Sequence, residues 1–128
     1  NGIKIKGFVD KDGNFIKEKY LPERKNLIFP INIFGWKKDN KKLISIILKK
    51  YKDTNDLEVI KINSEGFVTL KEKFLQKIFL GSNNQEIEEK LNLIFDIKEQ
   101  LKKQTIHKKI KSLDLTDLTI PEIKVFIP

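Results

Sequence analysis

Two hydrophobic periods alternate along this chain, and their order limits the folds that it can adopt. Apolar and polar residues alternate at period two in residues 3–9, 57–63 and 67–73, which is typical of strands with one buried face. Apolar residues recur at helical spacing in residues 39–52 and 84–103, and each of these stretches carries one broad apolar stripe. No run approaches the roughly 18 consecutive apolar residues of a membrane span.

Turn signals join these patterns into a fold. Asp12-Gly13 connects the first strand to a short return strand, so residues 3–17 are predicted to form a hairpin, and Glu65-Gly66 makes a second turn. Three further short strands are expected: residues 76–80, 109–115 and 122–127. The order of a hairpin, a helix, three strands, a helix and two strands predicts an α+β fold. We expect a mainly antiparallel sheet with two helices on one face.

The length of 128 residues predicts one domain, residues 1–128, with a core of its own. The chain has no cysteine, which excludes a disulfide framework and thiolate metal sites. It begins at Asn1 without a methionine, so we expect an excised or processed piece of a longer protein.

The net charge of +8 raises the question of a nucleic-acid partner. Of the 26 basic residues only Arg24 is an arginine, and the rest are lysines. Lysine is a compact point charge, whereas base recognition relies on arginine and on exposed aromatic residues. We therefore expect no specific nucleic-acid partner. A lysine-rich cytosolic domain that binds RNA or another polyanion remains the alternative.

The strand–glycine–helix junction in residues 76–95 has the order of a phosphate-binding loop. It contains only one glycine, Gly81, and Glu86, Glu88 and Glu89 crowd the start of the helix. A phosphate-binding turn has several glycines, and acidic residues at its helix N-terminus would repel the anion. The junction is therefore predicted to be a structural corner, and no cofactor site is expected.

Other candidates for chemistry are weak. His107 has no second histidine or carboxylate pair nearby, so a metal or general-base role is not expected. The sequence "DKDGN" lacks the glycine and glutamate spacing of a calcium loop. Asp114 and Asp117 are close in sequence, but no motif marks them as a hydrolytic pair. We expect no enzymatic activity, no metal and no cofactor.

Glu122 to Ile127 forms a short strand pattern between Pro121 and Pro128. Sheets often end with such a strand, and an unpaired edge offers a row of N–H and C=O groups to an incoming strand. Two alternatives remain open: an edge that proline protects and that pairs with nothing, or a strand in the middle of the sheet.

Five sequence segments occur in an order that is typical of one protein family. They are the hairpin "GFVDKDGNFI", the segment "FPINIFGW" before the first helix, the hairpin "LEVIKINSEGFVTL", the stretch "KIFLGSNNQEIEEKLNLI", and "IKSLDLTD" before the last strand. The fourth is the most specific, with Leu80-Gly81 after the strand and Lys90-Leu91 within the helix. In these segments and their order the sequence resembles the extracytoplasmic β domain of the bacterial cell-division protein FtsQ, called DivIB in Gram-positive organisms. The resemblance covers nearly the whole chain.

The resemblance implies a non-enzymatic scaffold. The family is anchored in the cytoplasmic (inner) membrane of bacteria, with this domain on the extracytoplasmic side. It joins FtsL and FtsB (DivIC) in a divisome subcomplex that regulates septal peptidoglycan synthesis at the septum. In the family a transmembrane helix and a POTRA domain precede the β domain. They are absent from these 128 residues, and we expect them upstream in the full-length protein.

In the family, the partner's C-terminal segment adds a strand to the last strand of the β domain. Carried over to this sequence, the implied partner-binding residues are Asp117, Glu122, Ile123, Lys124, Val125, Phe126 and Ile127. Alternation predicts that Ile123, Val125 and Ile127 share one face, with Lys124 and Phe126 on the other. Phe126 is the candidate aromatic anchor if it faces outwards.

Overall fold

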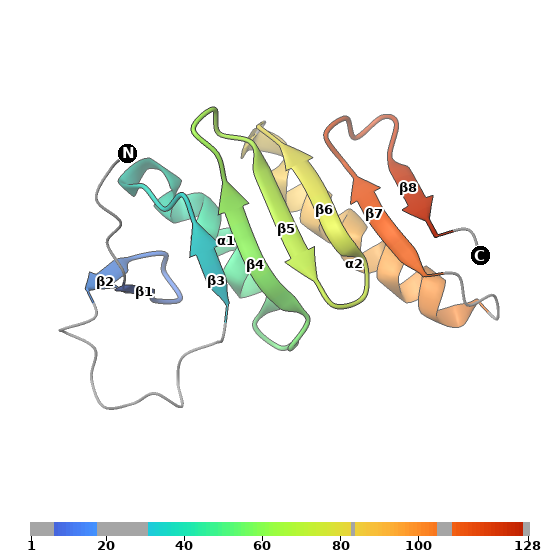
Figure 1. The fold of residues 1–128 in the computed structure, drawn as a ribbon, viewed down its shortest axis with the longest axis horizontal. Helices are drawn as coiled ribbons and strands as arrows, with labels where there is room; N and C mark the ends of the chain where they lie inside the picture. The colour runs from blue at the N-terminus through green and yellow to red at the C-terminus, as the bar shows by residue number, and fades with distance from the viewer. Residues whose placement is uncertain (1–6, 18–30, 83, 105–108, 127–128) are drawn as a thin grey trace.

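The computed structural model describes residues 7–17, 31–82, 84–104 and 109–126, in which two sheets and two helices form (Figure 1). The larger sheet has six strands in the order β3-β4-β5-β6-β7-β8. These strands are β3 (Asn32–Phe34), β4 (Leu57–Ile62), β5 (Val68–Glu72), β6 (Gln76–Gly81), β7 (Ile110–Asp114) and β8 (Glu122–Val125). Three of its five strand pairs are antiparallel, so the predicted α+β fold with a mainly antiparallel sheet is confirmed.

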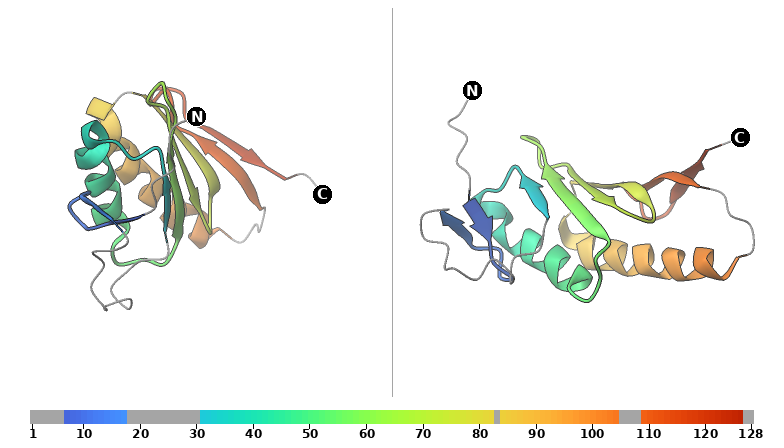
Figure 2. Two further views of the ribbon diagram at one scale, coloured as in Figure 1. Left: turned by 60° about the vertical axis from the view of Figure 1, so that its left-hand side comes forward. Right: turned by 60° about the horizontal axis from the view of Figure 1, so that its bottom comes forward.

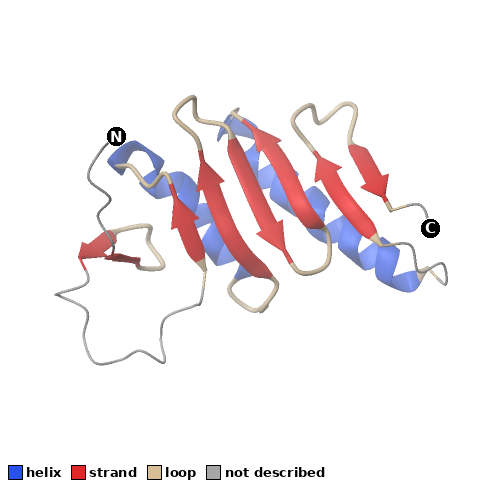
Figure 3. Cartoon of the chain, in the orientation of Figure 1, coloured by secondary structure: helices blue, strands red, loops and turns tan. Residues whose placement is uncertain are grey.

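The smaller sheet is the predicted hairpin, formed by β1 (Gly7–Val9) and β2 (Phe15–Lys17) and separate from the larger sheet (Figure 3). Residues 3–6, where the prediction begins it, lie outside the described residues. The Asp10 side chain closes the turn by accepting a hydrogen bond from the Asn14 N–H at 2.8 Å. The Trp36 indole donates to the Gly13 carbonyl at 2.8 Å, so the turn is held against the segment that leads into the first helix.

Two helices, α1 (Lys41–Tyr51) and α2 (Ile87–Lys103), cover one face of the larger sheet (Figure 2). The first helix, α1, begins at Lys41 within its predicted stretch, whereas α2 begins at Ile87, three residues later than predicted. A turn of 3-10 helix precedes each of them, at Lys38–Asn40 and Asn84–Glu86. Glu88 and Glu89 lie in the first turn of α2, where they complement the positive end of the helix dipole.

Strand β3 is an element that the sequence analysis missed. It has only three residues, too few for period-two alternation to be visible. It pairs in parallel with β4, and α1 forms the connection between them. β6 pairs in parallel with β7 in the same way, through α2. An antiparallel strand follows each pair, so the sheet consists of two consecutive βαββ units: β3-α1-β4-β5 and β6-α2-β7-β8.

The strand register repeats between the two units as well. One row of directly paired residues crosses the helix-covered face of the sheet: Ile33, Ile60, Leu70, Ile78, Leu113 and Ile123. The pairing of the second and third strands of each unit is irregular at the same place, between Leu57 and Val59 and between Ile110 and Ser112. Ile60 is therefore equivalent to Leu113, and Leu70 is equivalent to Ile123.

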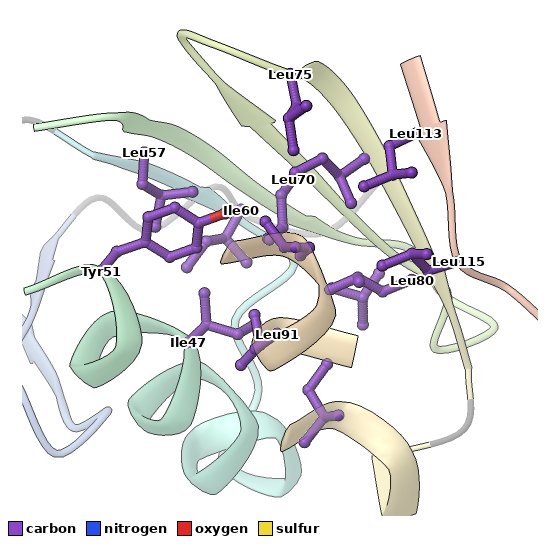
Figure 4. Packing of buried hydrophobic residues seen from close by; sticks show 14 of the residues in the cluster. Ile47, Tyr51, Leu57, Ile60, Leu70, Leu75, Leu80, Leu91, Leu113 and Leu115 are labelled. Carbon is purple, nitrogen blue, oxygen red and sulfur yellow. The ribbon is translucent and has the colours of Figure 1, made fainter. Parts of the chain in front are cut away.

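The core lies between this row and the helices. Ile60 and Leu70 are fully buried on the side of the sheet that faces α1 and α2, together with Ile47 and Leu91 of those helices (Figure 4). Burial of each such side chain stabilises the fold by about 1.5–3 kcal/mol. No described element covers the opposite face of the sheet, which we call the open face (Figure 2).

Candidate protein-binding edge

Strand β8 is the last strand of the larger sheet. It pairs with β7 on one side, and no strand in the described part of the chain pairs along its other side (Figure 1). Within the described residues β8 is therefore an edge strand, and the alternative of a strand in the middle of the sheet does not apply. The other end of the sheet is β3, which has three residues and pairs with β4.

Backbone alternation determines which groups of β8 face outwards. The Leu115 N–H donates to Phe79 of β6 at 2.8 Å, so the alternate residues Ser112 and Asp114 direct their backbone groups towards β8. Lys124 and Glu122 lie opposite these two residues and bond to β7. The intervening residues, Ile123 and Val125, direct their N–H and C=O groups away from the sheet. Among the described residues these groups have no partner strand, so they form a two-residue row of available backbone donors and acceptors.

Two large apolar side chains, Ile123 and Phe126, are exposed at this edge. Ile123 is 44% exposed, although it continues a row whose four preceding members are fully buried. Phe126 is 53% exposed, and the Lys111 ammonium lies 5.9 Å from its ring. Val125 is half-buried and packs against the core. Ile123 and Val125 thus lie on the helix side of the sheet, while Phe126 lies at the end of the strand with its ring accessible.

The loop from β7 to β8 is closed by its own aspartates. Asp114 accepts a hydrogen bond from the Thr116 N–H, and Asp117 accepts from both the N–H and the hydroxyl of Thr119. These Thr119 hydrogen bonds lower the pKa of the exposed Asp117 carboxyl below its usual value. Asp114 and Asp117 therefore shape the turn that leads into β8, and their carboxylates are engaged in that turn.

A buried lysine holds this loop to the rest of the sheet. Lys90 of α2 is fully buried, and its ammonium donates to the Leu80 carbonyl at 2.6 Å and to the Thr116 carbonyl at 3.4 Å. A buried ammonium needs such partners, because loss of its hydration is costly. Gly81 allows the close approach, since a side chain there would lie 3.1 Å from the Thr116 side chain. Lys90 thus fixes the end of β6 and the start of the loop before β8.

Of the residues implied by the resemblance, Glu122, Ile123, Lys124 and Val125 form β8 itself. Phe126 follows it and still donates its N–H to the Lys109 carbonyl, while Asp117 lies in the preceding loop. Ile127 and His107 lie outside the described residues.

Sequence reasoning noted Lys90 only as part of a motif and missed its role. The signal was available, because helical spacing places Lys90 on the apolar stripe with Ile87, Leu91 and Ile94.

A second buried polar cluster lies under the first βαββ unit. The Lys98 ammonium lies 2.7 Å from Asp56 and 2.9 Å from Glu72, and Glu72 also accepts hydrogen bonds from the Tyr51 hydroxyl and the Leu75 N–H. Burial raises the pKa of Tyr51, and the hydrogen bond from Lys98 lowers the pKa of Asp56. Every buried side-chain polar atom in the described residues has a partner. This cluster therefore joins α1, α2 and β5 structurally.

Neither α1 nor α2 is long and apolar enough to cross a membrane, and the described residues contain no other α-helix. No protein-family model matches the sequence, and no curated protein matches it at a significant level. The arrangement itself is that of an edge: a short strand with free backbone groups, apolar side chains beside them, and a loop fixed by Lys90.

Proposed function

We propose that this domain is a non-enzymatic scaffold that binds a partner protein by strand addition along β8. The observation that carries the proposal is the pair of outward-facing residues Ile123 and Val125. Their backbone groups are free among the described residues. The Ile123 side chain continues the core row but is exposed, and Val125 packs against the core. An extended partner segment would satisfy these backbone groups and bury the exposed part of Ile123.

The resemblance of the sequence to the FtsQ/DivIB β domain supplies the identity of the partner. The proposed partner is the C-terminal segment of an FtsB/DivIC homologue, with FtsL in the same divisome complex. The full-length protein would be anchored in the cytoplasmic membrane, with this domain on the extracytoplasmic side, and the complex would regulate septal peptidoglycan synthesis. Phe126, accessible beside Lys111, would serve as the aromatic anchor.

The alternative, a cytosolic domain that binds RNA or another polyanion, stays a prediction. Exposed lysines lie on both layers of the molecule, such as Lys41 and Lys42 on α1 and Lys61 and Lys71 on the sheet. Because these lysines are on both layers, the overall charge distribution does not favour polyanion binding as the main function of the domain over strand addition.

An amide-resonance titration with the C-terminal peptide of the cognate FtsB/DivIC homologue tests the proposal. We expect shifts concentrated in residues 109–126, with the Ile123 and Val125 amides gaining protection from hydrogen exchange because their N–H groups acquire acceptors. The Lys124 amide already bonds to β7 and serves as the internal control. Shifts spread over the α1 surface, or none at near-millimolar peptide, would contradict strand addition at β8.

A further inference from the structure

The open face of the larger sheet carries a row of lysines. On this face the strand register aligns Asn32, Val59, Lys71, Lys77, Ser112 and Lys124 across all six strands. In the neighbouring row Lys61 lies directly opposite Phe34. All four of these lysines are exposed.

Two lysines of this row lie directly opposite each other. Lys71 of β5 pairs with Lys77 of β6, and like charges at directly opposite positions are unfavourable. Among the described residues no carboxylate lies within ion-pair distance of Lys61, Lys71, Lys77 or Lys124. The free domain thus keeps an unfavourable pairing of exposed cations, which an anionic ligand would relieve.

Apolar surface accompanies these charges. The Lys77 ammonium lies 5.8 Å from the ring of Phe79, which is half-buried in the neighbouring row. Phe34 is 56% exposed next to Lys61. A ligand for this face would therefore combine negative charges with apolar groups.

We propose that the open face around Lys71 and Lys77 is a docking surface for an acidic polypeptide segment. Opposed lysines have Cβ atoms about 5 Å apart, so one carboxylate can bridge both ammonium groups. Nucleic acid fits less well, because the described face offers no arginine fork and β4 and β5 separate Phe34 from Phe79. That separation is about 14 Å, which prevents successive bases from stacking on the two rings. The proposal is independent of strand addition at β8.

The test measures binding of fluorescent poly-L-glutamate to the domain at low and moderate salt. We expect the Lys71→Glu/Lys77→Glu variant to lose about tenfold or more in affinity, because two attractive charges become repulsive. The matched control is Lys38→Glu/Lys42→Glu, which changes the net charge equally at the start of α1 and should lose far less. Lys71→Gln/Lys77→Gln guards against a folding defect and should lose an intermediate amount.

Three results would overturn the proposal. Equal losses in the test and control variants would show attraction by net charge alone. Tighter binding of oligothymidylate than of poly-L-glutamate, dependent on Lys71 and Lys77, would assign the face to nucleic acid. No binding of poly-L-glutamate at low salt would remove the site. A Val125→Pro variant should retain poly-L-glutamate binding, so a failure of the β8 proposal can be distinguished from a failure of this one.

Discussion

The two βαββ units place equivalent strands in different surroundings. β5 ends the first unit, and β6 pairs along its far side, whereas β8 ends the second unit at the edge of the sheet. Leu70 of β5 is fully buried, while Ile123, its equivalent in β8, is 44% exposed. The same local pattern thus has two outcomes. The burial of an apolar residue in a strand is therefore determined by its surroundings, the neighbouring strands and the helices over the sheet, rather than by the local sequence pattern alone.

The positions of Glu72 and Val125 extend this comparison. Glu72 pairs with Leu57 in the first unit, and Val125 pairs with Ile110 in the second, so the two are equivalent. Glu72 can be buried as a charged residue because α1, α2 and the turn after β5 supply it with a hydroxyl, an ammonium and an N–H. The equivalent position in β8 is instead occupied by Val125, an aliphatic residue that needs no polar partner.

The largest expected effect concerns the buried ion pair between Lys98 of α2 and Glu72 of β5. Lys98→Met should lower the free energy of unfolding by about 3–5 kcal/mol, because it leaves the carboxylate of Glu72 buried without its cation. Urea denaturation measures this loss. Lys102→Met, one turn later and exposed, is the control and should change stability by no more than about 0.5 kcal/mol. Adding Glu72→Gln to Lys98→Met should restore part of the loss, and a loss below about 1 kcal/mol in the single variant would contradict the buried-pair account.

A smaller difference in stability is expected between substitutions at the equivalent positions Leu70 and Ile123. Leu70→Ala should destabilise the free domain by about 2–5 kcal/mol, whereas Ile123→Ala should cost less than about 1 kcal/mol because its side chain is already part-exposed. The effects on binding should have the opposite order. Under conditions where both variants are folded, Ile123→Ala should weaken binding of the partner peptide more than Leu70→Ala does. Equal destabilisation of the free domain by the two substitutions would show that Ile123 is covered in solution.

The smallest expected effect is the pH dependence that arises from Asp56. Its pKa in the folded state is lowered by the hydrogen bond from Lys98, below the usual value of about 4. Its contribution to stability is therefore complete above that usual value and is lost as the pH falls through the lower folded-state pKa. Thermal unfolding between about pH 6 and pH 2 should show this loss. Asp56→Asn should reduce the fall in unfolding temperature at acidic pH. An unchanged fall in this variant would exclude Asp56 as its cause.

Much of the fold could be predicted from the sequence, because its elements follow the hydrophobic period. In the described part of the chain, both α-helices and seven of the eight strands lie where periodicity and turn residues place them. β3 could not be predicted, because three residues are too few to show a hydrophobic period. It is a strand because it pairs with β4, which is distant in sequence. The repeat of two βαββ units was also invisible, since it lies in pairing and register rather than in residue identity.

The candidate edge was predicted in part. The strand and its position near the chain's end followed from the alternation before Pro128, and its residues came from the resemblance. The outward direction of the Ile123 and Val125 backbone groups required the register with β7. Lys90 and Lys98 show a general limit: a lysine on an apolar stripe can be recognised in sequence, but its partners come from distant elements such as Thr116 and Glu72.

The proposed function requires that the outward backbone of β8 binds a partner strand. A comparison of Val125→Pro with Val125→Ala in binding the FtsB/DivIC C-terminal peptide tests this requirement. Val125→Pro removes the outward N–H while leaving the bonds of Lys124 to β7, and Val125→Ala keeps that N–H but shortens the side chain. We expect Val125→Pro to abolish binding in a folded domain and Val125→Ala largely to preserve it. Undiminished binding by Val125→Pro would contradict strand addition at this edge.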